Sequence, residues 1–319
     1  MKLTDLGEKE IIRRLSEFLD IGDDAACIRI SDEYLVLTTD MIYSETHILP
    51  VMSWEQVGKF IVTVNFSDLA AMGAKPLAFL LAYGGPDEEF ENFQSIIKSA
   101  DKQCKKYGAE YVGGDTKYAN KLTLAGTAIG LAKKPVLRSG AKPGDVLAVT
   151  GTLGSAAMAT DLIIRKLECD KKIIKKALEP EPRVEEGILL SRSVSAMTDI
   201  SDSLSLSIYD IADRSNVGVR LDINRIPVEK TAIKLSEDMN LNLMDYALYG
   251  GGDYELLFTV SEDSLRVIEK NIEATRIGSI TEEKDILGID SGREFAIKRR
   301  GYEHFRNLRN RNQNDFIVK

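Results

Sequence analysis

The chain has 319 residues, of which 44% are hydrophobic and 29% charged, and its formal net charge is −8. This length suits about two domains of roughly 100–200 residues each. The acidic balance argues against nucleic acid as the main partner, because a phosphate backbone is bound by a basic surface. A phosphate-bearing small molecule stays compatible with it, since acidic side chains can hold Mg²⁺ that then binds phosphate.

The cysteines and the hydropathy pattern give little sign of export. The three cysteines, Cys27, Cys104 and Cys169, are far apart and show neither zinc-type spacing nor a disulfide framework. Residues 1–14 are charged and do not resemble a signal peptide. No apolar run approaches the roughly 18 residues of a membrane span. We therefore expect a soluble, cytoplasmic protein without a membrane partner.

The first predicted elements end in acidic residues. Residues 6–19 predict an amphipathic helix, and Gly22-Asp23-Asp24 follows it. Two adjacent carboxylates either face solvent in a turn or share a cation. Residues 26–30 and 34–39 predict two strands.

The second strand ends in Thr38-Thr39-Asp40, and His47 follows in a loop. Hydroxyl and carboxylate oxygens suit Mg²⁺, although the same residues would also cap a strand end. A lone histidine is more often structural than catalytic.

Residues 53–76 predict a long and almost fully buried helix around which the chain is organised. Ser53 and Gln56 match a capping box at its start, and a glycine and a proline mark its end. Asn65, Ser67 and Asp68 place polar groups within this apolar helix. A buried carboxylate is costly unless it is paired or binds a metal. Asp68 is therefore either a satisfied structural carboxylate or a metal ligand.

The rest of the first half predicts a strand at 77–83, a helix at 86–107 and a strand at 122–131. Between the last two, Gly113-Gly114-Asp115 follows a strand end, and its glycines would let a ligand approach the backbone. A basic, Gly/Pro-rich connector then marks a boundary between domains 1–137 and 138–319.

The second half predicts a strand at 146–150, a tight turn at 151–154 rather than a P-loop, and a helix from residue 155. Residues 171–178 and 184–197 predict two more helices. Asp199 and Asp202 bracket a hydroxyl before another helix, where they would either cap it or bind a cation. Three glycines at 250–252 lead into a strand, and the polar residues 306–314 predict a frayed tail.

Taken together, six aspartates lie at the ends of apolar elements or inside one, and no His/Cys set competes for a metal. Oxygen-only ligands indicate Mg²⁺ rather than zinc, and more than one ion is plausible. Phosphoryl transfer suits such a site, because metal ions bridge phosphate oxygens and neutralise developing charge. The six are Asp24, Asp40, Asp68, Asp115, Asp199 and Asp202.

Seven motifs in order resemble the thiamine-monophosphate kinase family. This family belongs to the superfamily of aminoimidazole ribonucleotide synthetase, selenophosphate synthetase and the hydrogenase maturation protein HypE. The match runs from about residue 22 to residue 305. The motifs are Gly22-Asp23-Asp24-Ala25, Thr38-Thr39-Asp40-Met41, Asn65-Phe66-Ser67-Asp68-Leu69-Ala70-Ala71-Met72-Gly73-Ala74, Gly113-Gly114-Asp115-Thr116, Arg138-Ser139-Gly140-Ala141-Lys142-Pro143-Gly144-Asp145, Asp199-Ile200-Ser201-Asp202 and Gly251-Gly252-Asp253-Tyr254-Glu255-Leu256.

The resemblance implies a fold and an activity. The fold would be α/β (α+β) with two domains, each a mixed sheet packed by helices, and the N-terminal sheets would pair across a homodimer into a barrel. The activity would be ATP-dependent phosphorylation of thiamine monophosphate to thiamine diphosphate, by direct in-line transfer with several Mg²⁺ ions and no covalent nucleophile.

The resemblance also implies site residues. Asp68, Asp199 and Asp202 would act in catalysis through metal. The metal ligands would be Asp24, Thr38, Thr39, Asp40, Asp68, Asp115, Asp199 and Asp202. ATP would contact Tyr107, Gly114, Asp115, Arg138 and Ser201, and the substrate would lie against His47 and Tyr302.

The chain departs from the family pattern at Gly252, where a substrate-binding glutamate is expected, and at Ser203, where a glycine is expected. The first departure concerns the acceptor rather than the nucleotide chemistry. Two alternatives follow: an ATP-dependent synthetase or maturation enzyme of the same superfamily, or a nucleotide-binding regulator without turnover. The short segment at residues 1–14, which begins a helix at once, disfavours the synthetase.

Overall fold

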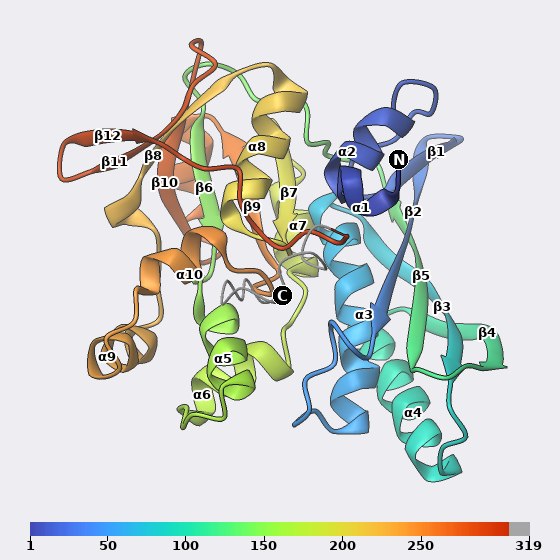
Figure 1. Ribbon diagram of the computed structural model, residues 1–319. Helices are drawn as coiled ribbons and strands as arrows, with labels where there is room; N and C mark the ends of the chain where they lie inside the picture. Colours follow the sequence, from blue (N-terminus) through green and yellow to red (C-terminus); the bar gives the residue numbers. More distant parts are fainter. Residues whose placement is uncertain (306–319) are drawn as a thin grey trace.

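The computed structural model describes residues 1–305, arranged as two sheets with helices packed on them (Figure 1). The predicted frayed tail at 306–314 lies outside the described residues. Residues 133–145 connect the two sheets, and the domain boundary after residue 137 stays a prediction.

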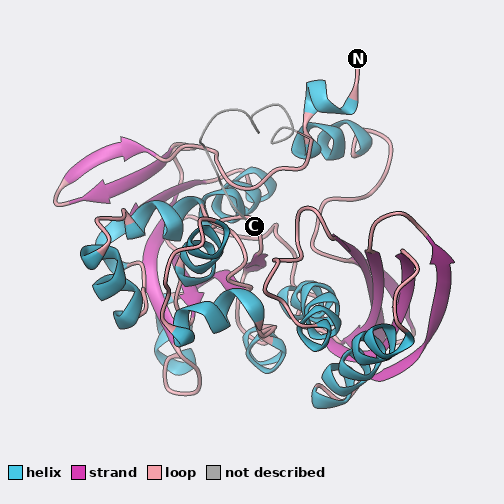
Figure 2. Ribbon diagram, turned by 60° about the horizontal axis from the view of Figure 1, so that its bottom comes forward, coloured by secondary structure: helices cyan, strands magenta, loops and turns pink. Residues whose placement is uncertain are grey.

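The first sheet has the order β1-β2-β5-β3-β4 and is mixed, because β3 and β4 pair in parallel while the other neighbours are antiparallel. Helices α3 (Trp54–Ala71) and α4 (Phe90–Lys106) cover one of its faces, and no helix within residues 1–305 covers the other (Figures 1 and 2). Its strands are β1 (Ala26–Ile30), β2 (Glu33–Tyr43), β5 (Thr123–Ala132), β3 (Lys75–Gly85) and β4 (Glu110–Tyr118).

The second sheet has the order β12-β11-β8-β10-β6-β9-β7 and is also mixed, with β8 and β11 parallel. Its strands are β6 (Val146–Thr150), β7 (Ala196–Ile200), β8 (Gly218–Asp222), β9 (Glu255–Val260), β10 (Ala274–Thr281), β11 (Ile286–Asp290) and β12 (Arg293–Ala296). The helices of this half are α5 (Ser155–Ile164), α6 (Lys171–Leu178), α7 (Val184–Leu190), α8 (Leu204–Ser215), α9 (Lys230–Asp238), α10 (Leu243–Tyr249) and α11 (Glu262–Ile268), with a short 3-10 helix at Ile223–Arg225. The predicted two-domain α/β architecture with mixed sheets is confirmed.

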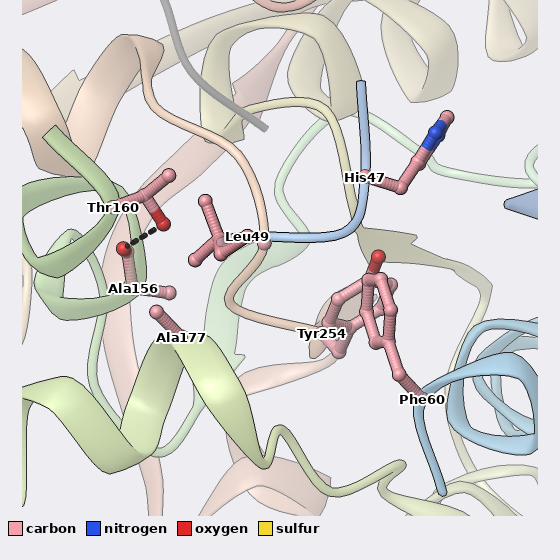
Figure 3. A pocket seen from close by; sticks show the side chains of 8 residues that line it. His47, Leu49, Phe60, Ala156, Thr160, Ala177 and Tyr254 are labelled. Atoms are coloured by element: carbon pink, nitrogen blue, oxygen red, sulfur yellow. Dashed lines mark hydrogen bonds between the residues drawn. The ribbon is translucent and has the colours of Figure 1, made fainter. Parts of the chain in front are cut away.

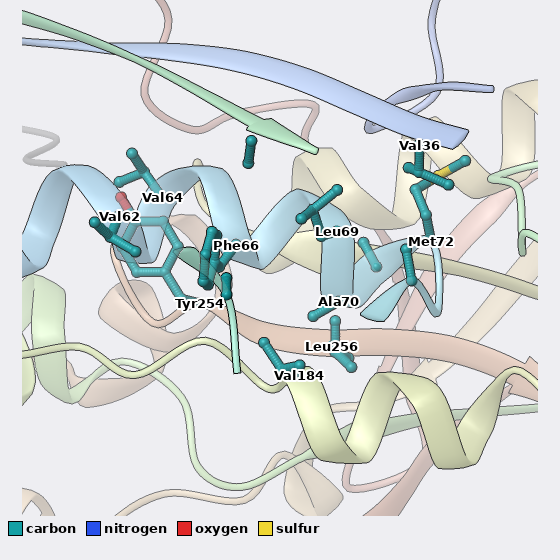
Figure 4. Close-up of a cluster of buried hydrophobic side chains, with 14 of the residues drawn as sticks. Val36, Val62, Val64, Phe66, Leu69, Ala70, Met72, Val184, Tyr254 and Leu256 are labelled. Atoms are coloured by element: carbon teal, nitrogen blue, oxygen red, sulfur yellow. The ribbon is translucent and has the colours of Figure 1, made fainter. Parts of the chain in front are cut away.

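Helix α3 is the layer that the two halves share. Its side chains pack on the first sheet through Val36 of β2, and on the second sheet through Leu256 of β9 (Figure 4). Val184 of α7 lies on the same side as Leu256. The predicted capping box is present, since the Ser53 side chain accepts from Gln56 N and Gln56 Oε1 accepts from Ser53 N. A helix buried on all sides must place every polar side chain it carries against a partner.

Two predicted helices are wrong in part. The helix expected at 6–19 is divided into α1 (Leu3–Leu6) and α2 (Glu8–Leu15) at Gly7, whose φ of 81° ends the first piece, and neither piece has a buried residue. The helix expected at 184–197 ends at Leu190, and its last residues belong to strand β7, which is buried throughout. Residues 196–200 form a strand despite their local helical pattern, because they are buried between α3 and β9.

Within residues 1–305, no helix combines the length and the apolar composition that crossing a membrane requires.

Candidate active site

Three polar side chains of α3 connect this helix to two strands, Asn65 and Asp68 to β2 and Ser67 to β7. Asn65 Oδ1 accepts a hydrogen bond from the backbone N–H of Asp40 at 2.9 Å, and Ser67 Oγ donates to Asp199 Oδ2 at 2.7 Å. Asp68 Oδ2 accepts from Thr38 Oγ1 at 2.5 Å. The polar interruptions of the apolar helix therefore bring β2 and β7, from the two sheets, to one place.

Three carboxylates meet there. Oxygen atoms of Asp24, Asp68 and Asp199 lie within 4.8 Å of one another, and Asp199 is only 4% exposed. Burial and the neighbouring carboxylates, Asp40 foremost, raise the pKa of Asp68 well above its ordinary value. Burial and then Asp24 raise the pKa of Asp199 to about 7. A cation bound beside Asp68 and Asp199 would therefore favour their charged forms.

Arg138 is the cation that faces this cluster. Its Nη2 lies 2.7 Å from Asp24 Oδ1, and its Nε lies 3.3 Å from Asp24 Oδ2 and 3.2 Å from Thr198 Oγ1. Thr198 Oγ1 in turn donates to Asp24 Oδ1 at 2.8 Å. The Asp24 carboxylate is thus oriented by Arg138, from the connector, and by Thr198, from the strand that carries Asp199.

The other predicted metal ligands, and the predicted ATP contact Ser201, differ in their exposure and in their hydrogen-bond partners. Asp40 is exposed, yet it is close enough to raise the pKa of Asp68. Thr39 is on the opposite face of β2 from Thr38 and donates to the carbonyl of Gly126 at 2.7 Å. Ser201 Oγ donates to Asp199 Oδ1 at 3.3 Å, and the carbonyl of Asp202 accepts from Tyr302 N at 3.2 Å.

Asp115 is not part of the cluster. It lies on the edge strand β4, and the register Met41–Ala125–Ala82–Asp115 places it three strands from β2, about 14 Å away. Its exposed carboxylate is 3.1 Å from Lys117 Nζ, and this hydrogen bond lowers its pKa. Asp115 is therefore not one of the three carboxylates whose oxygens lie within 4.8 Å of one another, and its role as a metal ligand stays a prediction.

The residues predicted to contact ATP have structural partners of their own. Tyr107 Oη donates to Glu181 Oε2 at 2.7 Å, and burial raises the pKa of this phenol. A side chain on Gly114 would place its Cβ 1.8 Å from the carbonyl oxygen of Leu81, so close pairing of β3 and β4 requires glycine there. These contacts leave the predicted nucleotide roles untested.

His47 and Tyr302 come together, as the predicted substrate pocket requires. Their ring centroids lie 6.4 Å apart, and both side chains are 8% exposed. His304 stacks on His47 at 5.3 Å and lies edge-on to Tyr302 at 4.9 Å. His304 is one of only two histidines, and that rarity was the one signal by which the sequence could have identified it.

A small cavity of about 10 Å³ lies beside this aromatic cluster. Figure 3 shows that the His47 ring points away from Ala156 and Ala177, which line the opposite side. Gly252 also lines this cavity, with φ of 93°, a backbone conformation that disfavours any other residue.

A larger cavity of about 330 Å³ adjoins the first and shares Ala156 with it. Lysines 172, 175 and 176 of α6 line it together with Asp253, Glu255 and Arg183. Asp253 Oδ2 accepts from Gly154 N at 2.8 Å, so the predicted tight turn before α5 is closed by a carboxylate. Asp253 and Glu255 belong to the motif at residues 251–256, and either could replace the substrate-binding carboxylate that Gly252 lacks.

Comparison with known proteins identifies the class to which this fold and acidic site belong. Residues 22–132 match the family "AIR synthase related protein, N-terminal domain", and residues 142–290 match the corresponding C-terminal domain. The chain is thus a two-domain AIR synthase related protein. A HypE–HypF complex, 21% identical with a TM-score of 0.74, shares this fold.

Closer relatives narrow the class. A thiamine-monophosphate kinase of Pyrococcus horikoshii is 38% identical over 95% of this chain and 98% of its own length. One of Methanospirillum hungatei is 39% identical over 92% and 97%. A structure described as "AaThiL complexed with AMPPCP and TMP" has a TM-score of 0.89 and 28% identity, and the match covers 95% of this chain and 99% of that one. The chain belongs to the thiamine-monophosphate kinase family, and the prediction that it is a phosphotransferase is confirmed.

Proposed function

We propose that the chain transfers the γ-phosphoryl group of ATP directly to the phosphate of thiamine monophosphate, giving thiamine diphosphate and ADP. The bond from the γ-phosphorus to the ADP oxygen breaks as a bond forms to an oxygen of the acceptor phosphate, in line. The buried meeting of Asp24, Asp68 and Asp199 carries this proposal. The names of the relatives and of the AMPPCP and TMP complex support the two substrates.

The residues present fit a magnesium site. The donors are all oxygens, which Mg²⁺ prefers, and Asp24, Asp68 and Asp199 bring carboxylate oxygens within 4.8 Å of one another. Asp24, Asp68 and Asp199 would hold the first ion, with Thr38 and Asp40 beside them. Asp202 completes the proposed ligand set around this ion, whereas Thr39, on the opposite face of β2, and Asp115, on β4, would enter the set only through another chain or a movement. Bound Mg²⁺ would neutralise charge that develops on the phosphate oxygens.

The protein's own groups orient the reactants. Arg138, whose planar guanidinium suits bidentate contact with phosphate oxygens, lies directly beside the cluster and would turn part of its fork to the triphosphate. Ser201, Tyr107 and Gly114 complete the proposed ATP contacts. No covalent nucleophile is needed, because positioning and electrostatic stabilisation supply most of the catalysis in this reaction class.

The acceptor would lie against His47 and Tyr302. A thiazolium cation is attracted to an aromatic face by the ring quadrupole, and two nearly buried rings at this point offer such a face. Gly252 adds no carboxylate here, so the aromatic cluster would supply a larger share of the substrate contact than in relatives with a glutamate.

We further propose that the chain forms a homodimer through the open face of its first sheet. This face exposes apolar side chains from β1, β2 and β4, among them Ile28, Ile30, Met41 and Val112, each more than half exposed. A sheet buried on one side only would gain from covering this surface with a second copy. Pairing of two such sheets would give the predicted barrel, and a second chain is also the means by which Asp115 could approach another site.

The test is turnover with ATP, Mg²⁺ and thiamine monophosphate, with both products separated by chromatography. Equal amounts of thiamine diphosphate and ADP are expected. ADP without thiamine diphosphate would show that the acceptor is a different molecule. Binding of ATP with no ADP formed would favour the regulator and contradict the proposal. Light scattering coupled to size exclusion, on the same sample, tests the dimer.

A further inference from the structure

Asp210 of helix α8 lies at the centre of a group of cations behind the acidic cluster. Its side chain is 13% exposed. Within residues 1–305, three cations lie within 4 Å of its carboxylate: Lys9 Nζ at 2.9 Å, Arg138 Nη1 at 3.4 Å and Arg299 Nη2 at 3.8 Å. Asp210 belongs to none of the motifs that the sequence analysis identified.

Arg138 is held between two carboxylates. One edge of its guanidinium, Nε and Nη2, meets Asp24, and the remaining nitrogen Nη1 faces Asp210. Asp210 therefore attracts one end of the planar fork while the other end is hydrogen-bonded to Asp24, and this attraction keeps the guanidinium beside the cluster. Asp210 is not one of the three carboxylates of the cluster, and its effect on the cluster passes through Arg138.

The contact between Arg138 and Asp210 would matter most when a divalent cation binds at the acidic cluster. A cation on Asp24 would repel the guanidinium beside it, and the attraction of Asp24 for Arg138 would fall. Asp210 would then be the carboxylate that keeps Arg138 next to the cluster and free to turn toward phosphate.

The surroundings keep Asp210 ionised for this purpose. Burial by itself raises the pKa of Asp210, but Lys9, followed by Arg138 and Arg299, holds it below its ordinary value. Lys9 comes from α2, a helix with no buried residue, whose backbone N–H at Lys9 also donates to Glu303 Oε1 at 3.3 Å. The N-terminal helix is thus attached to the site by polar contacts.

We propose that Asp210 is a positioning residue: it holds Arg138 in the orientation in which this arginine serves nucleotide binding, with Lys9 of the N-terminal helix as its second partner. The inference rests on the proposed function, in that it assumes a nucleotide–metal complex at the acidic cluster. It does not depend on the identity of the acceptor.

The experiment measures the affinity for AMPPCP in the presence of Mg²⁺ by calorimetry, which requires no turnover. Asp210→Asn is expected to weaken binding by about tenfold, a usual coupling for charged neighbours. The matched control is Asp213→Asn, three residues along the same helix, which removes the same charge from an exposed side chain paired with Arg299. It is expected to change the affinity less than twofold.

A double-mutant cycle separates positioning from folding. In an Arg138→Gln background, Asp210→Asn should change the affinity less than twofold, because its target is gone. Asp210→Glu, which keeps the charge, should bind within about threefold of the unchanged protein. A tenfold loss that persists without Arg138, or equal effects of Asp210→Asn and Asp213→Asn, would overturn the proposal.

Circular dichroism checks that each variant folds, and Asp210→Ser replaces Asp210→Asn in the cycle if the latter does not. The outcomes for the two proposals are distinguishable. If thiamine monophosphate is not phosphorylated while the binding cycle behaves as expected, the acceptor assignment fails and the role of Asp210 stands. If turnover is normal but the cycle shows no coupling, only the role of Asp210 fails.

Discussion

Replacing Asp68 by asparagine should make the metal-free protein more stable and at the same time inactive. In the metal-free protein Asp68 lies within 4.8 Å of two other carboxylates, with Arg138 as a shared neighbour. Two like charges at that distance repel by about 3.5 kcal/mol at an effective dielectric constant of 20. Because the raised pKa values already relieve part of this repulsion by protonation, we expect a net gain of about 1–3 kcal/mol at about pH 8.

Asparagine keeps the shape of the side chain and an oxygen that accepts the hydrogen bond from Thr38 Oγ1. The change therefore removes charge with little change in packing. For a chain of this size the melting temperature should rise by about 1.5–4.5 °C in the presence of a chelator. Mg²⁺ with AMPPCP should stabilise the unchanged protein by mass action and should not stabilise the variant.

The assay is thermal unfolding with chelator and with Mg²⁺–AMPPCP, followed by turnover. The control is Asp32→Asn in the exposed turn between β1 and β2, which removes the same charge and should leave both measurements unchanged. Near-normal activity of Asp68→Asn would remove Asp68 from the metal site. A metal-free variant less stable than the unchanged protein by more than 1 kcal/mol would refute the electrostatic reasoning, whatever the activity.

Three further outcomes are expected. The pKa of Asp199 is about 7 in the folded protein and near 3.8 in the unfolded chain. The metal-free protein should therefore lose stability as the pH rises from about 4 to about 7. Bound Mg²⁺ should reduce this dependence of the unfolding free energy on pH. Gly252→Glu, which restores the family's usual residue, should lower the free energy of unfolding in urea by about 1–2 kcal/mol, because φ at this position is 93°. An unchanged urea midpoint would show that the backbone relaxes to accommodate the side chain. Arg183→Met should lower the free energy of unfolding by about 3 kcal/mol, because it leaves the buried Glu255 without the cation that now lies 2.6 Å away at Arg183 Nε. The double variant Arg183→Met, Glu255→Gln should recover much of this loss in the same unfolding measurement.

Local patterns in the sequence determined the elements and the type of chemistry. The capping box at Ser53, the apolar spacing of α3 and the turn before α5 act over a few residues, and the structure has them where they were predicted. The excess of aspartate over histidine and cysteine at element ends likewise indicated an oxygen-ligand site, since ligand type follows from composition alone.

Tertiary structure decided which of the aspartates meet. Asp24, Asp68 and Asp199 come from three distant segments and converge because α3 is buried between both sheets, whereas Asp115 has the same sequence signature and lies across the sheet. Tertiary structure also determined the strand at Ala196–Ile200, which pairs with β9 and is buried although its local pattern predicted a helix. The two carboxylates beside Arg138, Asp24 and Asp210, come from distant segments of the chain, and no local pattern marks Asp210. Contacts between distant segments depend on how the sheets pack around α3, and that packing is a property of the whole chain rather than of any one stretch.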